Sequence, residues 1–193
     1  MRILGLDLAF KRTGWSLLSA KEQGKATLLE RGAILTDRND THPAKLASLS
    51  KQLRGLLVRT KPDLVCIETP GRMNQMPYRQ VATIVHLSQA LGLALLHAHE
   101  LGIPILEVTQ DRAKEELTGN KYADKETVHA HLELLSKAGE LDNYTTPRRP
   151  RGGIDYDEDD GTSVGLVGVR QAGLLQSKAK DGTAKPKALR RTV

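Results

Sequence analysis

Two isolated acids and one acidic cluster are the residues of this chain best suited to chemistry. Asp7 lies inside an apolar run at the start of the chain, and Glu68 ends a second apolar run. A buried carboxylate is unfavourable unless it is paired or binds a metal, so both positions are unusual. In the acidic cluster, Asp157 and Asp160 lie three residues apart and would share one face of a helix.

If these four carboxylates converge on one pocket, their mutual repulsion requires cations. Oxygen ligands of this kind suit Mg²⁺, for which Mn²⁺ can substitute. Two such ions about 4 Å apart would activate a water and stabilise the leaving oxygen of a phosphodiester. The pattern therefore predicts two ions in one site, with Asp7, Glu68, Asp157 and Asp160 as the catalytic metal ligands.

Each acid also has a simpler explanation. Asp7 could end a strand in a turn, and Glu68 could be a solvated strand end. The acidic cluster could cap a helix N-terminus and interact with its macrodipole. Within the cluster, Asp155 and Asp159 remain alternatives to Asp157. We favour the catalytic interpretation because three separate acidic elements, two of them on apolar runs, fit one site.

Basic residues in predicted loops and at helix ends mark the expected path of a polyanion. Phosphate contacts by such residues give sequence-independent affinity that weakens with salt, whereas the alternative is an ordinary solvated surface. The family resemblance given below implies a base-stacking aromatic, for which Tyr78 is the candidate, with packing as its alternative role. The predicted DNA-binding set is Arg72, Tyr78, Arg79, Lys114, Lys121, Lys125, Arg148, Arg149 and Arg151.

The bulk composition predicts one domain and a polyanionic partner. The 193 residues are 39% hydrophobic, and the net charge is +6 with a pI of about 9.5. A single cysteine, Cys66, excludes an internal disulfide framework, and its apolar neighbours predict a buried residue. The start of the chain lacks the long apolar region of a signal peptide, and no uncharged apolar run approaches the roughly 20 residues that span a bilayer. The cytoplasm is therefore the expected compartment, with no membrane partner.

The hydrophobic pattern predicts the elements that position the acids. Apolar runs predict strands over residues 1–8, 15–18, 26–35, 64–67 and 103–108, whereas helical spacing predicts helices over 43–59, 78–101, 109–119, 124–136 and from 157 or 160 to 175. Strands first, then strand–helix alternation, predict a mixed sheet with helices on both faces. Residues 138–156 are predicted to be a loop. The domain is predicted to span residues 1–176, followed by a basic, disordered tail over 177–193.

The predicted last helix carries a stripe of glycines at positions 161, 165 and 168. Each glycine destabilises a helix by about 1 kcal/mol relative to alanine. A close approach of this helix to the sheet would explain why they are present.

Five blocks of the sequence, taken in order, resemble the RuvC-type resolvases of the RNase H-like superfamily. Each block is weak alone, but the ordered set extends over roughly residues 1–175 and is specific. The blocks are Ile-Leu-Gly-Leu-Asp at 3–7 with Thr-Gly-Trp at 13–15, Pro-Asp-Leu-Val-Cys-Ile-Glu at 62–68, Gly-Ile-Pro-Ile-Leu-Glu at 102–107, the lysine-bearing stretch 113–125, and Asp-Glu-Asp-Asp-Gly at 157–161.

This resemblance implies an α/β fold, RNase H-like, with a mixed five-stranded sheet and helices on both faces. It implies a homodimer that binds a four-way DNA (Holliday) junction and nicks two strands symmetrically, leaving 5′-phosphate and 3′-hydroxyl ends. It also implies Mg²⁺, held by the four acids named above. Lys114 and Lys125 match lysines that contact phosphate or stabilise transition-state charge, so Lys125 joins the catalytic set.

Several departures from the family pattern indicate a divergent branch, with a phage origin as one hypothesis. Leu8 and Ala9 replace the usual Pro-Gly, and the loop after Glu68 is longer. No aromatic residue aligns with the family's base-stacking position, and an insertion contains Arg-Arg-Pro-Arg at 148–151. These differences affect the expected sequence preference more than the expected chemistry.

Three rival functions remain from the sequence. An actin-like ATPase or sugar kinase also opens with a strand, an Asp and a Thr-Gly turn, but needs a second phosphate loop that this chain does not show. A non-catalytic DNA-binding module would not require four converging acids. An RNA-processing nuclease of the same fold is the third rival.

Overall fold

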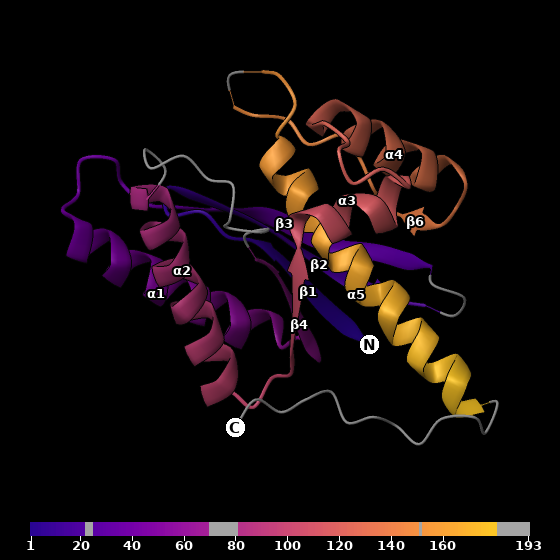
Figure 1. Cartoon of the computed structure of the whole chain (residues 1–193), viewed down its shortest axis with the longest axis horizontal. Helices are drawn as coiled ribbons and strands as arrows, with labels where there is room; N and C mark the ends of the chain where they lie inside the picture. The colour runs from indigo at the N-terminus through magenta and orange to yellow at the C-terminus, as the bar shows by residue number, and fades with distance from the viewer. Residues whose placement is uncertain (22–24, 70–80, 151, 181–193) are drawn as a thin grey trace.

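The computed structural model of the protein describes residues 1–21, 25–69, 81–150 and 152–180. After an initial group of three strands, helices and strands alternate in this part of the chain except that α4 follows α3 directly (Figure 1). The elements in order are β1 (Arg2–Asp7), β2 (Arg12–Ala20), β3 (Ala26–Leu35), α1 (His42–Thr60), β4 (Leu64–Thr69), α2 (Val81–Glu100), β5 (Ile105–Thr109), α3 (Gln110–Thr118), α4 (Lys125–Lys137), β6 (Leu141–Asp142) and α5 (Tyr156–Lys180).

The strands form one mixed sheet in the order β5-β4-β1-β2-β3-β6. β1, β2 and β3 are antiparallel neighbours, and β4 and β5 continue the sheet in parallel beside β1. The predicted number of five strands is wrong by one, because β6 pairs with the start of β3 inside the segment predicted to be a loop. A strand of two residues is too short to show an alternating pattern in a sequence.

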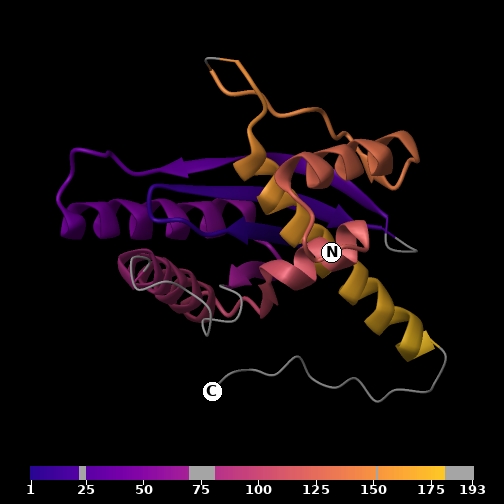
Figure 2. The same ribbon diagram turned by 45° about the horizontal axis from the view of Figure 1, so that its top comes forward.

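The sheet has a hydrophobic core on each side, because successive side chains of a strand point to opposite faces. One core joins leucines of α1 and alanines of α2 to Leu4, Leu6 and Ile67. The other joins α3, α4 and α5 to Ile3 and Cys66. Figure 2 shows α2 and α4 on opposite sides of the sheet. Helices on both faces and a buried Cys66 confirm the predictions for the core.

Short capping interactions set the ends of the two helices that carry the predicted lysines. The Thr109 side chain accepts a hydrogen bond from Arg112 N at the start of α3, and Gly119, with a φ of 76°, ends that helix. The Asp124 side chain accepts from Thr127 N at 2.8 Å, which places Lys125 in the first turn of α4.

The last helix is longer than predicted, since α5 continues to Lys180. Its final residues lie within the region predicted to be a tail, and the rest of that region, residues 181–193, lies outside the described residues. None of the helices in the described ranges has the length and apolar character needed to cross a membrane.

Candidate active site

The first two acids lie side by side at one end of the sheet. β1 and β4 are parallel neighbours in which Leu6 is level with Ile67, so Asp7 and Glu68 each follow at the same level. Leu6 and Ile67 pack in the core beneath α1 and α2. Because side chains alternate along a strand, both carboxylates project to the opposite face, which α5 covers.

Glycines bring the acidic end of α5 down onto this part of the sheet. Gly14 is level with Asp7 on the neighbouring strand, and a Cβ built on Gly14 would overlap the carbonyl oxygen of Asp157. A Cβ on Gly5 would likewise overlap the backbone of α5 at Gly161, where Ser16 Oγ also donates a 3.1 Å hydrogen bond. The predicted close approach of the glycine-bearing helix is therefore confirmed.

The electrostatics of the two strand acids are those of a shared, poorly solvated site. Burial, with the negative charge of Asp160 second, raises the pKa of Asp7 from 3.8 to about 7. Burial, followed by the charges of Asp7 and Asp160, raises the pKa of Glu68 from 4.5 to about 8. The positive charge of Lys125 opposes both increases in pKa. The negative charge of Asp160 thus acts on both strand acids at this end of the sheet.

Protein cations pair with the two acids on α5. Lys125 Nζ lies 2.8 Å from Asp160 Oδ2 and 3.6 Å from Asp157 Oδ1. Arg12 Nε lies 2.8 Å from Asp157 Oδ2, although its N–H is not aligned for a hydrogen bond and the contact is an ion pair. Arg149 Nη2 approaches the same oxygen at 3.5 Å. The Asp157 carboxylate therefore has three positive neighbours.

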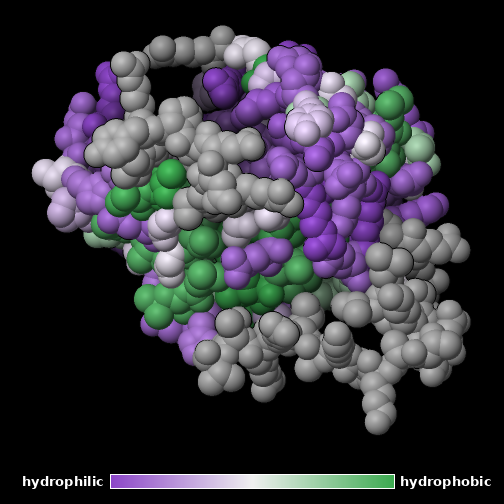
Figure 3. All heavy atoms as spheres, viewed as in Figure 1, coloured by the Kyte–Doolittle hydropathy of each residue, from purple (hydrophilic) through white to green (hydrophobic). Residues whose placement is uncertain are grey.

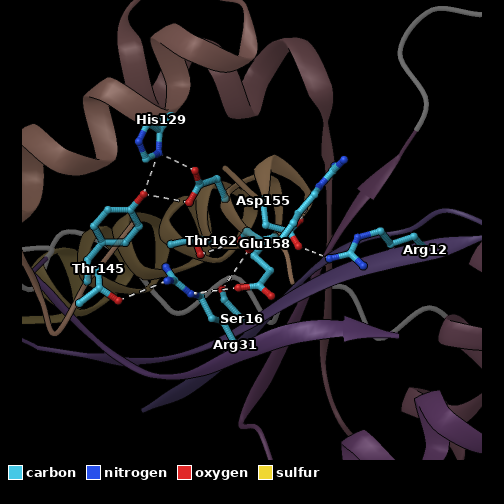
Figure 4. A network of polar contacts seen from close by, with 12 residues as sticks. Arg12, Ser16, Arg31, His129, Thr145, Asp155, Glu158 and Thr162 are labelled. Carbon is cyan, nitrogen blue, oxygen red and sulfur yellow. Dashed lines mark hydrogen bonds and ion pairs between the residues drawn. The ribbon is translucent and has the colours of Figure 1, made fainter. Parts of the chain in front are cut away.

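The other two acids considered at this site differ from each other: Asp155 shares its cations with Asp157, whereas Asp159 is held by Tyr144 and His129 (Figure 4). Asp155 is buried and pairs with the Arg12 guanidinium. Asp159, also buried, accepts a 2.9 Å hydrogen bond from Tyr144 Oη and lies 2.7 Å from His129 Nδ1. Neither acid is among the charges that raise the pKa of Asp7. Asp157 and Asp160 are therefore the α5 acids whose charges raise the pKa of Asp7.

The donor set suits a hard divalent cation, although the acids do not chelate one as they stand. Among the residues that the structure describes, no three acidic, histidine or cysteine side chains form a group able to hold a metal ion. Lys125 and Arg12 are paired with the α5 acids in this arrangement. Burial, followed by neighbouring negative charge, nevertheless raises the pKa of Asp7 and Glu68, and a cation that prefers oxygen ligands would stabilise their ionised forms.

The predicted DNA-binding residues fall into two groups around the acids. Lys114 and Lys125 are both close enough to lower the pKa of Glu68, and Lys121 lies in the turn between their helices. Arg148 forms an isolated β-bridge with Ile154 in the predicted insertion. The remaining predictions for Arg72, Tyr78, Arg79 and Arg151 concern positions outside the described residues.

Sequence reasoning missed the residues that hold the acidic end of α5 in place. Arg12 was not predicted, although its position five residues after Asp7, beside Lys11, was a visible signal of positive charge. The contact between His129 and Asp159 joins α4 to α5 across 30 positions, and Tyr144 lies in a segment without periodicity. No local pattern could have indicated that contact.

Comparisons with known protein sequences match most of the chain. The family model described as crossover junction endodeoxyribonuclease RuvC matches residues 3–144. A protein of that name from Petrotoga mobilis is 33% identical over 147 residues, which cover 76% of this chain and 85% of the relative. Another from Synechococcus sp. (strain WH7803) is 32% identical over 157 residues, 80% of this chain and 92% of the relative.

Solved structures show the same RNase H-like fold. The structure of T. thermophilus RuvC in complex with a Holliday junction substrate aligns with a TM-score of 0.73 at 24% identity, covering 96% of this chain and 99% of that one. The yeast mitochondrial Holliday junction resolvase Ydc2 aligns with a TM-score of 0.68 at 15% identity, covering 93% of this chain and 82% of that one. The predicted fold class is confirmed.

Proposed function

Because this chain belongs to the RuvC family of crossover junction endodeoxyribonucleases, we propose that Asp7, Glu68, Asp157 and Asp160 form the metal site with which it resolves four-way DNA junctions. The reaction is hydrolysis of DNA phosphodiesters by paired nicks in the cytoplasm. One observation carries the proposal: buried carboxylates from two neighbouring strands meet the acidic end of α5.

Two Mg²⁺ ions, or Mn²⁺ in their place, would supply the charge that activates the attacking water and stabilises the leaving oxygen. Asp7 and Glu68 are partly protonated near neutral pH and release those protons when a cation binds, since ligands must be ionised. The Lys125 side chain is about half exposed. Its ammonium group is therefore free to exchange Asp160 for a DNA phosphate when a cation takes over the neutralisation of the carboxylate.

Basic side chains around the acids support a DNA path across the end of the sheet. Lys114 and Lys121 lie on the α3 side of the site, and Arg149 lies on the insertion side. All three are suited to phosphate oxygens, which carry no sequence information. In the free protein Arg149 pairs with Asp155 and Asp157, and in the complex a DNA phosphate would compete with these carboxylates. Its contribution to affinity should therefore weaken with salt.

Paired incision requires two active sites, and α2 offers a surface for a second copy of the chain. Val85, Gly92 and Leu96 are spaced to share one face of α2, and Val85 and Leu96 are each about half exposed. Figure 3 shows hydrophobic residues gathered over this part of the molecule. We place the homodimer contact there. In light scattering, Leu96→Glu should yield monomers, whereas Leu134→Glu on the other side of the sheet should leave dimers.

The central experiment is incubation of the protein with an end-labelled four-way junction, with Mg²⁺ or with EDTA. Linear DNA, an RNA duplex and ATP serve as competing substrates that represent the rival functions. We expect symmetric nicks in two junction strands only when Mg²⁺ is present. Asp160→Asn should bind the junction but not cut it, because the variant keeps the shape and loses the charge.

The matched control is Glu115→Gln. Glu115 is an exposed carboxylate on α3, and among the described residues Arg112 pairs with its neighbour Glu116 instead. The Glu115→Gln variant should cut at the wild-type rate. Undiminished cutting by Asp160→Asn would remove that residue from the metal site. Preferential cutting of RNA, or turnover of ATP without nicking, would replace the proposed function with one of the rivals.

A further inference from the structure

The turn between α3 and α4 is a rigid support for one outward-facing aromatic ring. Asn120 Oδ1 accepts a 3.0 Å hydrogen bond from Tyr122 N, and Asn120 O accepts one of 3.1 Å from Ala123 N. Thr118 Oγ1 in turn accepts from Asn120 N at 3.1 Å. Ala123 is buried in the core. The backbone on both sides of Tyr122 is therefore fixed, while the side chain points away from the fold.

Tyr122 is 79% exposed, more than any other large hydrophobic residue in the described part of the chain. The ammonium group of Lys121 lies 5.0 Å from the centre of its ring. This cation–π contact pairs the ring with a positive charge but leaves the tyrosine in water. An aromatic ring on a fixed backbone, next to a lysine, combines the stacking and electrostatic groups that proteins use to bind single-stranded nucleic acid.

The turn that carries Tyr122 leads directly into the helix that bears Lys125, a cation of the acidic site. Tyr122 precedes Lys125 by three residues, a span of at most roughly 11 Å. The Lys125 ammonium group reaches Asp160, and Lys114 acts on Glu68 from the preceding helix. A DNA strand whose phosphate lay over the acids would follow these positive charges, and one of its nucleotides would then pass beside Tyr122.

We propose that Tyr122 stacks on the base of an unpaired or partly unstacked nucleotide next to the phosphodiester that is cut. The proposal rests on the proposed function, because it needs DNA at the acidic site. The negatively charged strand, with bases opened at the branch point, complements both the lysines and the ring. Stacking there holds the cut strand in register with the carboxylates. Tyr122 is thus a DNA-positioning residue.

The test uses four-way junctions in which 2-aminopurine replaces single bases on either side of the cut. Stacking on an aromatic ring quenches its fluorescence. The measurement is made with the full-length protein in EDTA, so that binding is seen without cleavage. We expect wild type to quench one of the positions next to the cut. Tyr122→Ala should lose this quenching and bind about 5- to 100-fold more weakly, whereas Tyr122→Phe should retain both properties.

Leu134→Ala is the matched control, since Leu134 is a large side chain of α4 that is 58% exposed. It should bind and quench like wild type. Equal quenching by wild type and Tyr122→Ala would overturn the proposal. It would also be overturned if the substitution changed only the oligomeric state of the protein. Cleavage by wild type separates the two hypotheses. If wild type cuts junctions normally but its quenching does not depend on Tyr122, only the stacking hypothesis is wrong. If wild type neither binds nor cuts junctions, the proposed function is wrong as well.

Discussion

Replacement of Asp7 by Asn should stabilise the metal-free protein at alkaline pH while abolishing its cleavage of DNA. In the folded chain the pKa of Asp7 is raised to about 7 from 3.8, chiefly by burial. The folded state therefore retains a proton that the unfolded chain releases. The contribution of this bound proton to the free energy of unfolding is complete below pH 4 and is lost as the pH rises through 7. Asn has the same shape and carries no charge to bury.

The size of the effect follows from the two pKa values. The difference between 3.8 and about 7 corresponds to roughly 4 kcal/mol, at about 1.4 kcal/mol for each pKa unit. We therefore expect the free energy of unfolding of Asp7→Asn to exceed that of wild type by up to about 4 kcal/mol at pH 8. At pH 4 the two free energies should be equal. For a chain of this size, that gain raises the melting temperature by about 8–16 °C.

The assay is thermal unfolding in EDTA at several pH values from 4 to 8, repeated with excess Mg²⁺. Magnesium should reduce the difference in stability between the variant and wild type. At a Mg²⁺ concentration a hundred times the dissociation constant, binding stabilises wild type by about 2.7 kcal/mol, whereas the variant lacks one ligand and is stabilised less. Glu115→Gln, an exposed carboxylate, serves as the control and should melt like wild type at every pH. A variant no more stable than wild type at pH 8 would refute the idea that Asp7 is a penalised, buried charge.

Three further substitutions test how the site is held together. Gly14→Ala should destabilise the fold by about 3 kcal/mol or more, because its Cβ would overlap the Asp157 backbone; equal urea midpoints would contradict this packing. Gly55→Ala, in α1 with open space around it, should instead stabilise the protein by about 1 kcal/mol in the same urea assay. Tyr144→Phe removes one of the two buried hydrogen-bond partners of Asp159 and should lower the free energy of unfolding by about 1–3 kcal/mol. An unchanged urea midpoint for this variant would show that the hydroxyl contributes nothing.

Much of the fold was open to prediction because its signals are local. The buried strand around Asp7 and the short strand before Glu68 follow from runs of apolar residues, and the helices from their spacing. The glycine stripe of α5 even predicted the close contact with the sheet, because glycines that weaken a helix need a packing reason. The two-residue β6 gave no such signal, since its existence depends on a partner strand distant in sequence.

The sequence by itself determined the elements and the identity of the acids, since hydrophobic periodicity and apolar surroundings are properties of neighbouring residues. It also determined the family, through the order of its motifs. Only the tertiary structure decided which acids meet and which are held apart. Asp157 and Asp159 are two positions apart on one helix, yet the first lies over the sheet end and the second is bonded to His129 and Tyr144. The helix turns by about 200° between these two residues, so they lie on different faces of α5. Only the packing around α5 determines which of these faces lies against the strand carboxylates.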